Sequence, residues 1–186
     1  MNFMCAKSRV SSTALMFTLL IGAGSVFAQN ENKEPDFQKQ WRDTKKSYDE
    51  GNHSDACARW MIMSYSGIPD GAHATANCYL DGKAVPQSFD MAAKYFECAA
   101  IQGYFRSQVA LAMLIFESKV NPPGDRDAYF WFSIAAANAD APPEGKSAAA
   151  AMRDAAAKQM KPEQIRKVQL LTSRWKAGPN SSCFFK

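Results

Sequence analysis

Five cysteines and two histidines are the residues of this 186-residue chain best suited to metal binding or covalent chemistry. Cys5 lies near the beginning, and four other cysteines are spread through the chain: Cys57, Cys78, Cys98 and Cys183. No two cysteines form a CxxC pair, and neither His53 nor His73 lies in an HExxH sequence. Zinc sites use short, regular ligand spacings of that kind. The sequence therefore predicts no metal site.

Catalytic chemistry is not predicted either. No serine lies in a GxSxG sequence, no glycine-rich phosphate loop is present, and the acidic residues are scattered. A nucleophile needs a base that the fold places beside it, and no spacing in this chain selects such a pair. We therefore predict no catalytic residues, no enzymatic activity and no cofactor.

Five residues are candidates for binding, and three of them are consecutive: Tyr104, Phe105 and Arg106. We expect these three in a turn between two repeats, and turns carry function more often than cores do. Tyrosine and arginine are also enriched among residues that dominate binding energies. The alternative is that Phe105 only seals the junction between repeats. His73 and Asn77 complete the set as exposed residues of the preceding repeat, with both histidines expected at the surface near helix starts.

The first 28 residues have the pattern of a secretory signal peptide. Lys7 and Arg9 precede an apolar run at residues 13–22, and small residues follow up to a cleavage point before Gln29. The apolar run is shorter than the roughly 20 residues of a membrane span, although an uncleaved anchor is the alternative. We expect a disordered lead-in at residues 29–35, no stable membrane span after cleavage, and a periplasmic or secreted protein.

Charge gives no sign of a nucleic-acid partner. Cleavage removes two basic residues and no acidic ones, so the formal charge of +4 falls to +2. The remaining charges of both signs are interspersed, whereas nucleic-acid-binding domains carry a basic patch or stripe.

A period of 36 residues runs through the middle of the chain. Gly67 and Gly103 are 36 residues apart, and the same spacing aligns three alanines and three aromatic residues: Ala56, Ala92 and Ala128; Trp60, Phe96 and Phe132. Such a period is typical of helical solenoids. The sequence predicts an all-α, right-handed superhelical solenoid of antiparallel helix pairs. We expect repeats at residues 36–67, 68–103 and 104–140, capping helices at 141–177 and a tail at 178–186.

Apolar spacing and breaker residues set the expected helices. The first lies between Asp36 and Gly51, and a later one begins near Ser147 as its cap and runs to Met160. We treat residues 68–71 (Ile-Pro-Asp-Gly) as a turn. The other helices are expected at residues 55–66, 72–80, 89–102, 108–116, 126–138 and 162–176.

Four cysteines in an exported chain favour disulfides, with three possible connectivities. The helices at residues 55–66 and 72–80 should be antiparallel, and Cys57 and Cys78 are equidistant from the turn between them. We therefore predict a Cys57–Cys78 bond, and a second bond from Cys98 to Cys183 that ties the tail to the second repeat. The alternative is that some of these cysteines are small apolar residues of helix faces.

The second repeat resembles the Sel-one-like repeat, a branch of the tetratricopeptide-like helical repeats. The similarity lies in Leu80-Asp81-Gly82-Lys83-Ala84-Val85, Met91-Ala92, Tyr95-Phe96, Ala99-Ala100 and Gly103. The third repeat resembles the family through Ala128, Trp131-Phe132 and Ala135-Ala136, but has Ser118 and Ala139 where the family usually has glycine. The first repeat matches only at Ala56, Trp60 and Gly67. Residues 162–165 are similar to the closing helix of exported bacterial members.

The resemblance implies a non-catalytic adaptor. We expect an exported adaptor or regulator that binds a single envelope or secreted protein through its repeat surface, with an inhibitor or immunity role as a special case. The alternative, from a cysteine-rich branch of the family, is a protein that binds or hydrolyses β-lactams or cell-wall fragments. That branch has a cysteine pair in each repeat, and this chain has no cysteine in its third repeat.

Overall fold

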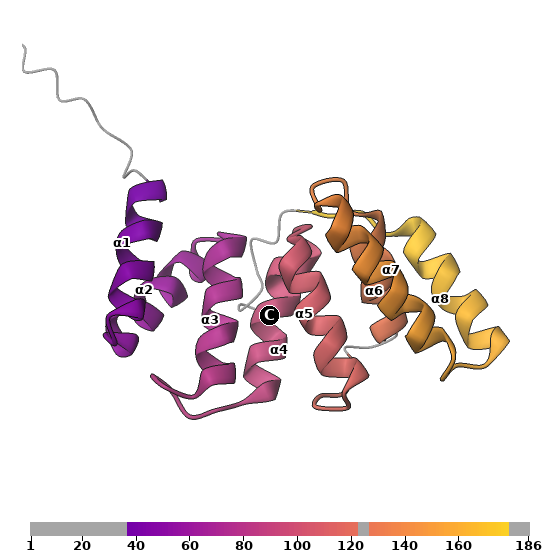
Figure 1. Ribbon diagram of the computed structural model, residues 1–186, viewed down its shortest axis with the longest axis horizontal. Helices are drawn as coiled ribbons and strands as arrows, with labels where there is room; N and C mark the ends of the chain where they lie inside the picture. Colours follow the sequence, from indigo (N-terminus) through magenta and orange to yellow (C-terminus); the bar gives the residue numbers. More distant parts are fainter. Residues whose placement is uncertain (1–36, 123–126, 179–186) are drawn as a thin grey trace, which may run out of the picture. The chain divides into compact units, whose positions relative to one another are not determined.

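The computed structural model describes residues 37–122 and 127–178. These residues form helices and no strand (Figure 1), which confirms the all-α fold. The helices of the described part are α1 (Phe37–Asp49), α2 (His53–Tyr65), α3 (Pro69–Asp81), α4 (Phe89–Ile101), α5 (Phe105–Phe116), α6 (Ala128–Ala137), α7 (Pro143–Ala157) and α8 (Pro162–Arg174). The expected signal peptide and lead-in lie outside the described residues.

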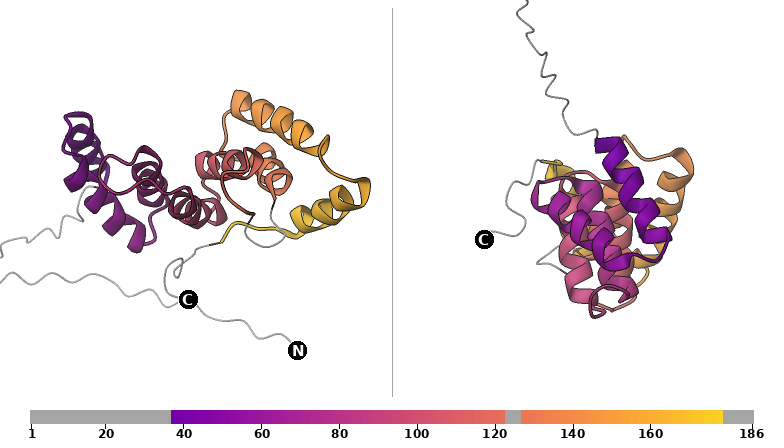
Figure 2. Two further views of the ribbon diagram at one scale, coloured as in Figure 1. Left: turned by 90° about the horizontal axis from the view of Figure 1, so that it is seen from below. Right: turned by 90° about the vertical axis from the view of Figure 1, so that its left-hand side faces the viewer.

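Each helix from α1 to α6 packs against the next one in the chain, and α8 packs back against α6. Figures 1 and 2 show these consecutive helices side by side. Such neighbour-to-neighbour packing is that of a helical-repeat solenoid, as expected. The assignment of repeat boundaries and the right-handed sense of the superhelix remain predictions.

The aligned alanines and aromatic residues are the core of the stack. Ala56, Ala92 and Ala128 are buried on α2, α4 and α6, and so are the three aligned aromatic side chains: Trp60, Phe96 and Phe132. The buried side chains form one large cluster that extends from α3 to α8, a separate one that joins α1 and α2 to α3, and a small third one between α3 and α4. The 36-residue period therefore reflects one packing position in each helix pair.

The expected turn at residues 68–71 is wrong, because α3 already begins at Pro69. Proline suits the first helical position, where its missing N–H would have no intrahelical partner. Gly71 also lies within the helix, for a different reason. A Cβ atom at Gly71 would come within 2.5 Å of the Met63 Cβ atom, so glycine allows α2 and α3 to approach closely.

Other helix starts also differ from expectation. Helix α5 begins at Phe105 rather than at residue 108. Helix α6 begins at Ala128, after Asp127, whose carboxylate accepts a hydrogen bond from the Phe130 N–H at 2.8 Å. Helix α7 begins at Pro143, so Ser147 is not its cap; the Ser147 hydroxyl donates to the Pro143 carbonyl within the helix.

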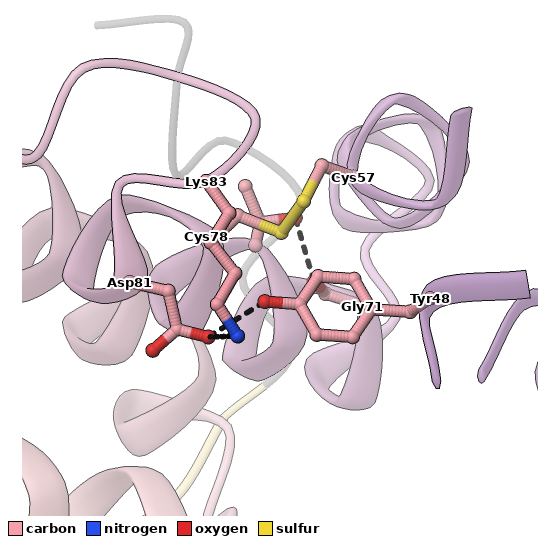
Figure 3. Close-up of a disulfide and its surroundings, with 7 residues drawn as sticks. Tyr48, Cys57, Gly71, Cys78, Asp81 and Lys83 are labelled. Atoms are coloured by element: carbon pink, nitrogen blue, oxygen red, sulfur yellow. Dashed lines mark hydrogen bonds and ion pairs between the residues drawn. A yellow bond between two sulfur atoms is a disulfide. The ribbon is translucent and has the colours of Figure 1, made fainter. Parts of the chain in front are cut away.

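The predicted Cys57–Cys78 disulfide is present and joins α2 to α3, with 6.1 Å between the Cα atoms. Beside it, the Tyr48 hydroxyl donates a 2.6 Å hydrogen bond to Asp81, and the Lys83 ammonium lies 5.7 Å from the Tyr48 ring centroid (Figure 3). Burial, followed by the Asp81 carboxylate, raises the pKa of Tyr48 to about 12, so the hydroxyl stays a donor. Covalent and polar contacts therefore tie the first two helices to α3.

The second predicted disulfide stays a prediction. Cys98 is buried on α4, packed with Ala72 and Ala99. Cys183 lies outside the described residues.

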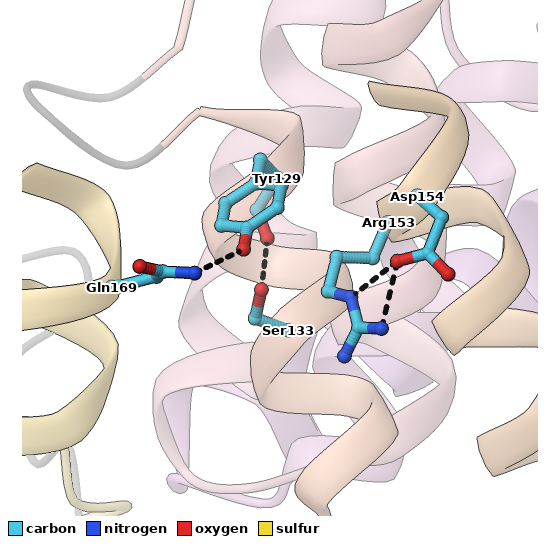
Figure 4. Close-up of polar contacts among 5 residues, drawn as sticks. All are labelled: Tyr129, Ser133, Arg153, Asp154 and Gln169. Carbon is cyan, nitrogen blue, oxygen red and sulfur yellow. Dashed lines mark hydrogen bonds and ion pairs between the residues drawn. The ribbon is translucent and has the colours of Figure 1, made fainter. Parts of the chain in front are cut away.

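The far end of the stack is held by α6. Gln169 on α8 donates a hydrogen bond to the Tyr129 hydroxyl at 3.2 Å, and the Ser133 hydroxyl donates to the Tyr129 carbonyl at 2.6 Å (Figure 4). On the outer side of α7, Arg153 and Asp154 form an ion pair at 2.7 Å. Because α7 and α8 both pack on α6, they cover the apolar surface of the last repeat.

Replacing Cys57 and Cys78 by alanine should lower the free energy of unfolding by about 3 kcal/mol, because the bond closes a loop of 21 residues' separation. The loss should be seen in thermal unfolding of the non-reduced protein. Hydrogen exchange should rise mainly in α1 and α2, which belong to the separate cluster, and little in α6 to α8. Equal exchange along the whole chain would contradict this assignment.

Candidate functional site

A surface pocket of about 580 Å³ lies where α3, α5 and α7 begin. Its lining comes from Pro69 and Asp70 at the start of α3, from residues 102–106 at the junction of α4 and α5, and from Asp140 and Pro142 just before α7. The N-terminal ends of three alternate helices, α3, α5 and α7, thus lie at one pocket. None of these three helices has a side-chain cap.

The three consecutive candidates, Tyr104, Phe105 and Arg106, line this pocket. They do not form a free turn as expected: Tyr104 is the N-cap of α5, and the other two belong to its first turn. Phe105 also contacts α7, since a Cβ atom at Gly145 would lie 2.8 Å from the Phe105 ring. Phe105 therefore sits at the junction between repeats, while the Arg106 side chain is exposed.

His73 is not a surface residue near a helix start. Its ring packs 5.2 Å from the Phe96 ring and 5.4 Å from the Tyr104 ring, centroid to centroid. Its Nδ1 atom lies 2.9 Å from the Ser107 hydroxyl oxygen. Burial, together with the nearby Arg106 cation, lowers the pKa of His73 to about 4. His73 therefore supports the pocket from behind as a neutral residue.

Asn77 lies on α3 and is half-buried, but it does not line the pocket. The structure thus brings Tyr104, Phe105, Arg106 and His73 together and leaves Asn77 outside the group.

Tyr104 links two repeats through its hydroxyl group. The hydroxyl donates a 3.0 Å hydrogen bond to Asp70 on α3, while its ring packs on His73. Burial, followed by the Asp70 carboxylate, raises the pKa of Tyr104 to about 12. The Tyr104 hydroxyl is therefore a fixed donor at neutral pH, and its position is set by both helices.

A buried amide network beneath the pocket was missed by the sequence analysis. Gln108 is fully buried on α5 and donates to the Ala100 carbonyl at 3.1 Å. Asn138, at the end of α6, donates to the Gly103 carbonyl at 2.7 Å and to the Gln108 carbonyl oxygen at 2.9 Å. Gly103 has a φ of +93°, a conformation that favours glycine. The sequence signal of this network was weak, because Gln108 follows Arg106 and Ser107 and stands just before the apolar run at residues 109–116.

The arrangement favours non-covalent binding. A serine beside a histidine is the pair that a hydrolase would use, but Ser107 is 0% exposed and no substrate carbonyl can reach it. Within residues 37–122 and 127–178, no three His, Cys, Asp or Glu side chains gather to hold a metal ion. The accessible groups are the Arg106 cation, the Asp70 and Asp140 carboxylates, and the apolar surfaces of prolines.

Comparisons with known proteins identify the fold. No family model matches the chain, and no curated protein matches it. Among solved structures, the chain is similar, with a TM-score of 0.64 and 21% identity, to a protective antigen of uropathogenic Escherichia coli strains that displays an SLR fold, the Sel-one-like repeat fold. The alignment covers 76% of this chain and 30% of that protein. The resemblance seen in the sequence is therefore confirmed at the level of the fold.

In the described part of the chain, no helix is both long and apolar enough to cross a bilayer.

Acid should destabilise the protein through His73. The unfolded chain binds a proton at the ordinary pKa of 6.5, whereas folded His73 binds one only near pH 4. The unfolded state therefore binds more protons between these values, and stability falls as pH drops from about 6.5 to about 4. We expect a loss of about 2 to 3 kcal/mol over this range. Urea unfolding at several pH values should show a flatter profile for His73→Gln than for the parent or His53→Gln.

Removing the Asn138 amide should destabilise the repeat junction. Asn138→Ala leaves the Gly103 carbonyl and the buried Gln108 side chain without their donor, a change that typically costs about 1 to 3 kcal/mol. The exposed residue Asn121 offers a matched control, since Asn121→Ala should change stability by less than about 0.5 kcal/mol. Equal midpoints of urea unfolding for the two variants would show that the network is not structural.

Proposed function

We propose that this protein is exported and binds one other protein of the cell envelope, or one secreted protein, through the pocket where α3, α5 and α7 begin. A small inhibitor or immunity-type protein would act in the same way. The observation that carries the proposal is the convergence of Tyr104, Phe105 and Arg106 on one pocket of about 580 Å³.

The chemistry of the pocket suits a protein partner. Arg106 is exposed and Tyr104 is held in place by Asp70 and His73. Tyrosine and arginine are the residue types that most often dominate interface energies when they are well positioned. Because the residues around the pocket are already packed between helices, little conformational freedom is lost on binding.

Export is supported by two independent features. The Cys57–Cys78 disulfide is typical of oxidising compartments, and the first 28 residues have the pattern of a signal peptide. A partner that meets this protein after export is itself in the envelope or outside the cell. We do not extend the proposal to hydrolysis of β-lactams or cell-wall fragments, because Ser107, the serine beside His73, is buried.

Tagged full-length protein should capture one dominant envelope or secreted protein after crosslinking in intact cells. Arg106→Glu removes the exposed cation, and Tyr104→Ala removes the fixed ring and donor, so each should weaken binding to the purified partner at least about tenfold. Arg42→Glu makes the same charge change on an exposed residue of α1, away from the pocket, and should bind like the parent.

The affinities are measured by calorimetry on variants whose circular dichroism matches that of the parent. A partner that binds all variants equally would move the interface away from this pocket. Recovery of folded bait with no enriched protein would overturn the proposal as a whole.

A further inference from the structure

One repeat position is buried in two helix pairs and exposed in the first. Ile62, Cys98 and Ile134 are related by the 36-residue period and lie on α2, α4 and α6. Cys98 and Ile134 are 3% and 6% exposed, whereas Ile62 is 65% exposed. The residue one turn after Ile62, Tyr65, is also 50% exposed. The first pair thus presents an apolar step, Ile62 with Tyr65, where the later pairs are covered.

The chain itself covers part of the corresponding surface on α4. After α8, residues 175–178 turn back toward the earlier helices (Figures 1 and 2). Trp175 packs against Trp131 of α6, and the Gly178 N–H donates a 3.0 Å hydrogen bond to the Ile101 carbonyl of α4. Ile101 is the residue that corresponds to Tyr65 in the 36-residue period. Residues 175–178, which we name the strap, therefore lead from the third helix pair to the second.

The strap fits this path through a small residue. A Cβ atom at Gly103 would lie 3.1 Å from the Ala177 Cβ atom, so the strap lies directly against the junction of α4 and α5. The strap runs from α6 to α4, and a continuation in the same direction would lead toward α2. Eight further residues, 179–186, follow it in the sequence and include Phe184 and Phe185.

We propose that residues 179–186 continue the strap and dock Phe184 and Phe185 on the apolar step formed by Ile62 and Tyr65. Eight extended residues reach about 26 Å, and neighbouring helices are about 8 to 10 Å apart, so the segment is long enough to pass from α4 to α2. Two adjacent phenylalanines supply apolar surface of the kind that Ile62 and Tyr65 expose.

The proposal also agrees with the predicted Cys98–Cys183 bond. Cys98 occupies the period position of Ile62 in the second pair, so a bond from Cys183 would bring Phe184 and Phe185 to the second pair, which is the neighbour of the pair that carries the apolar step. Residues 179–186 would then cover Ile62 in the first helix pair, as Cys98 and Ile134 are already buried in the second and third pairs.

A photoreactive residue at the apolar step tests the occupant directly. Ile62→p-benzoylphenylalanine in the full chain should crosslink within the same molecule, and mass spectrometry should place the crosslink in residues 179–186. The same substitution at Leu170, which is 52% exposed on α8, is the matched control and should not reach that segment. Circular dichroism checks that both variants are folded.

Hydroxyl-radical footprinting gives a second readout without a bulky probe. The double variant Phe184→Ser, Phe185→Ser should raise oxidation of Tyr65 at least twofold and leave Leu170 unchanged. A crosslink from position 62 to a second copy, seen as a dimer whose yield grows with protein concentration, would overturn the proposal. So would a crosslink confined to other parts of the chain, a crosslink to an unrelated protein, or unchanged Tyr65 oxidation in the double variant.

Discussion

The close approach of neighbouring helix backbones is the constraint on which this structure depends. Ala56, Ala92 and Ala128 occupy one position in three successive helix pairs and are all buried. Gly71 takes the constraint to its limit, because even a methyl group there would collide with Met63. Small residues at these points let the helices stack, and the aromatic residues four positions later fill the space beside them. The small alanine and glycine residues therefore specify the helix stack as much as the large aromatic residues do.

The pocket is a consequence of this stacking. When each helix packs against the next, every second helix begins at the same edge, which brings the starts of α3, α5 and α7 together. The contacts that hold α3 to α5 are the ones that shape the pocket: Tyr104 bonds to Asp70, and His73 to Ser107. The residues that join α3 to α5 are therefore the same residues that line or support the proposed binding pocket. A substitution behind the pocket, as at His73, would change the shape of the pocket. A substitution among its exposed lining residues, as at Arg106, would change the charged groups that it offers to a partner.

The sequence predicted the existence of the helices better than the residues at which they begin. The 36-residue period and the apolar spacing located all the helices of the described part, and helix antiparallelism located the Cys57–Cys78 bond. Two helix starts were predicted wrongly at prolines: Pro69 was placed in a turn, and the helix of Pro143 was expected to begin near Ser147. Both prolines stand at a first helical position. These prolines lack only an N–H that a helix start leaves unpaired, so local sequence does not distinguish the two cases.

The hydrogen-bond network of Gln108 and Asn138 was not predicted from the sequence, for a different reason. Gln108 and Asn138 are 30 residues apart, and their hydrogen bond exists only because α5 and α6 pack together. His73 was misjudged in the same way: its burial comes from Phe96 and Tyr104, which lie on later helices. Within one helix these residues look exposed, and only the stacking of the next pair buries them. Pairwise contacts between repeats are therefore the part of the site that a single sequence does not reveal.

The position of the disulfide follows from the two ends of the stack. In a solenoid an end pair has one neighbour, so it gains one interface where an inner pair gains two. At the far end, α7 and α8 both cover α6, and Val168 of α8 joins the main buried cluster. At the near end, α1 and α2 belong to the separate cluster, and α2 packs on the later helices chiefly through α3. The Cys57–Cys78 bond lies at the interface of α2 with α3. There it adds a covalent link to an end pair that has a neighbouring pair on one side only.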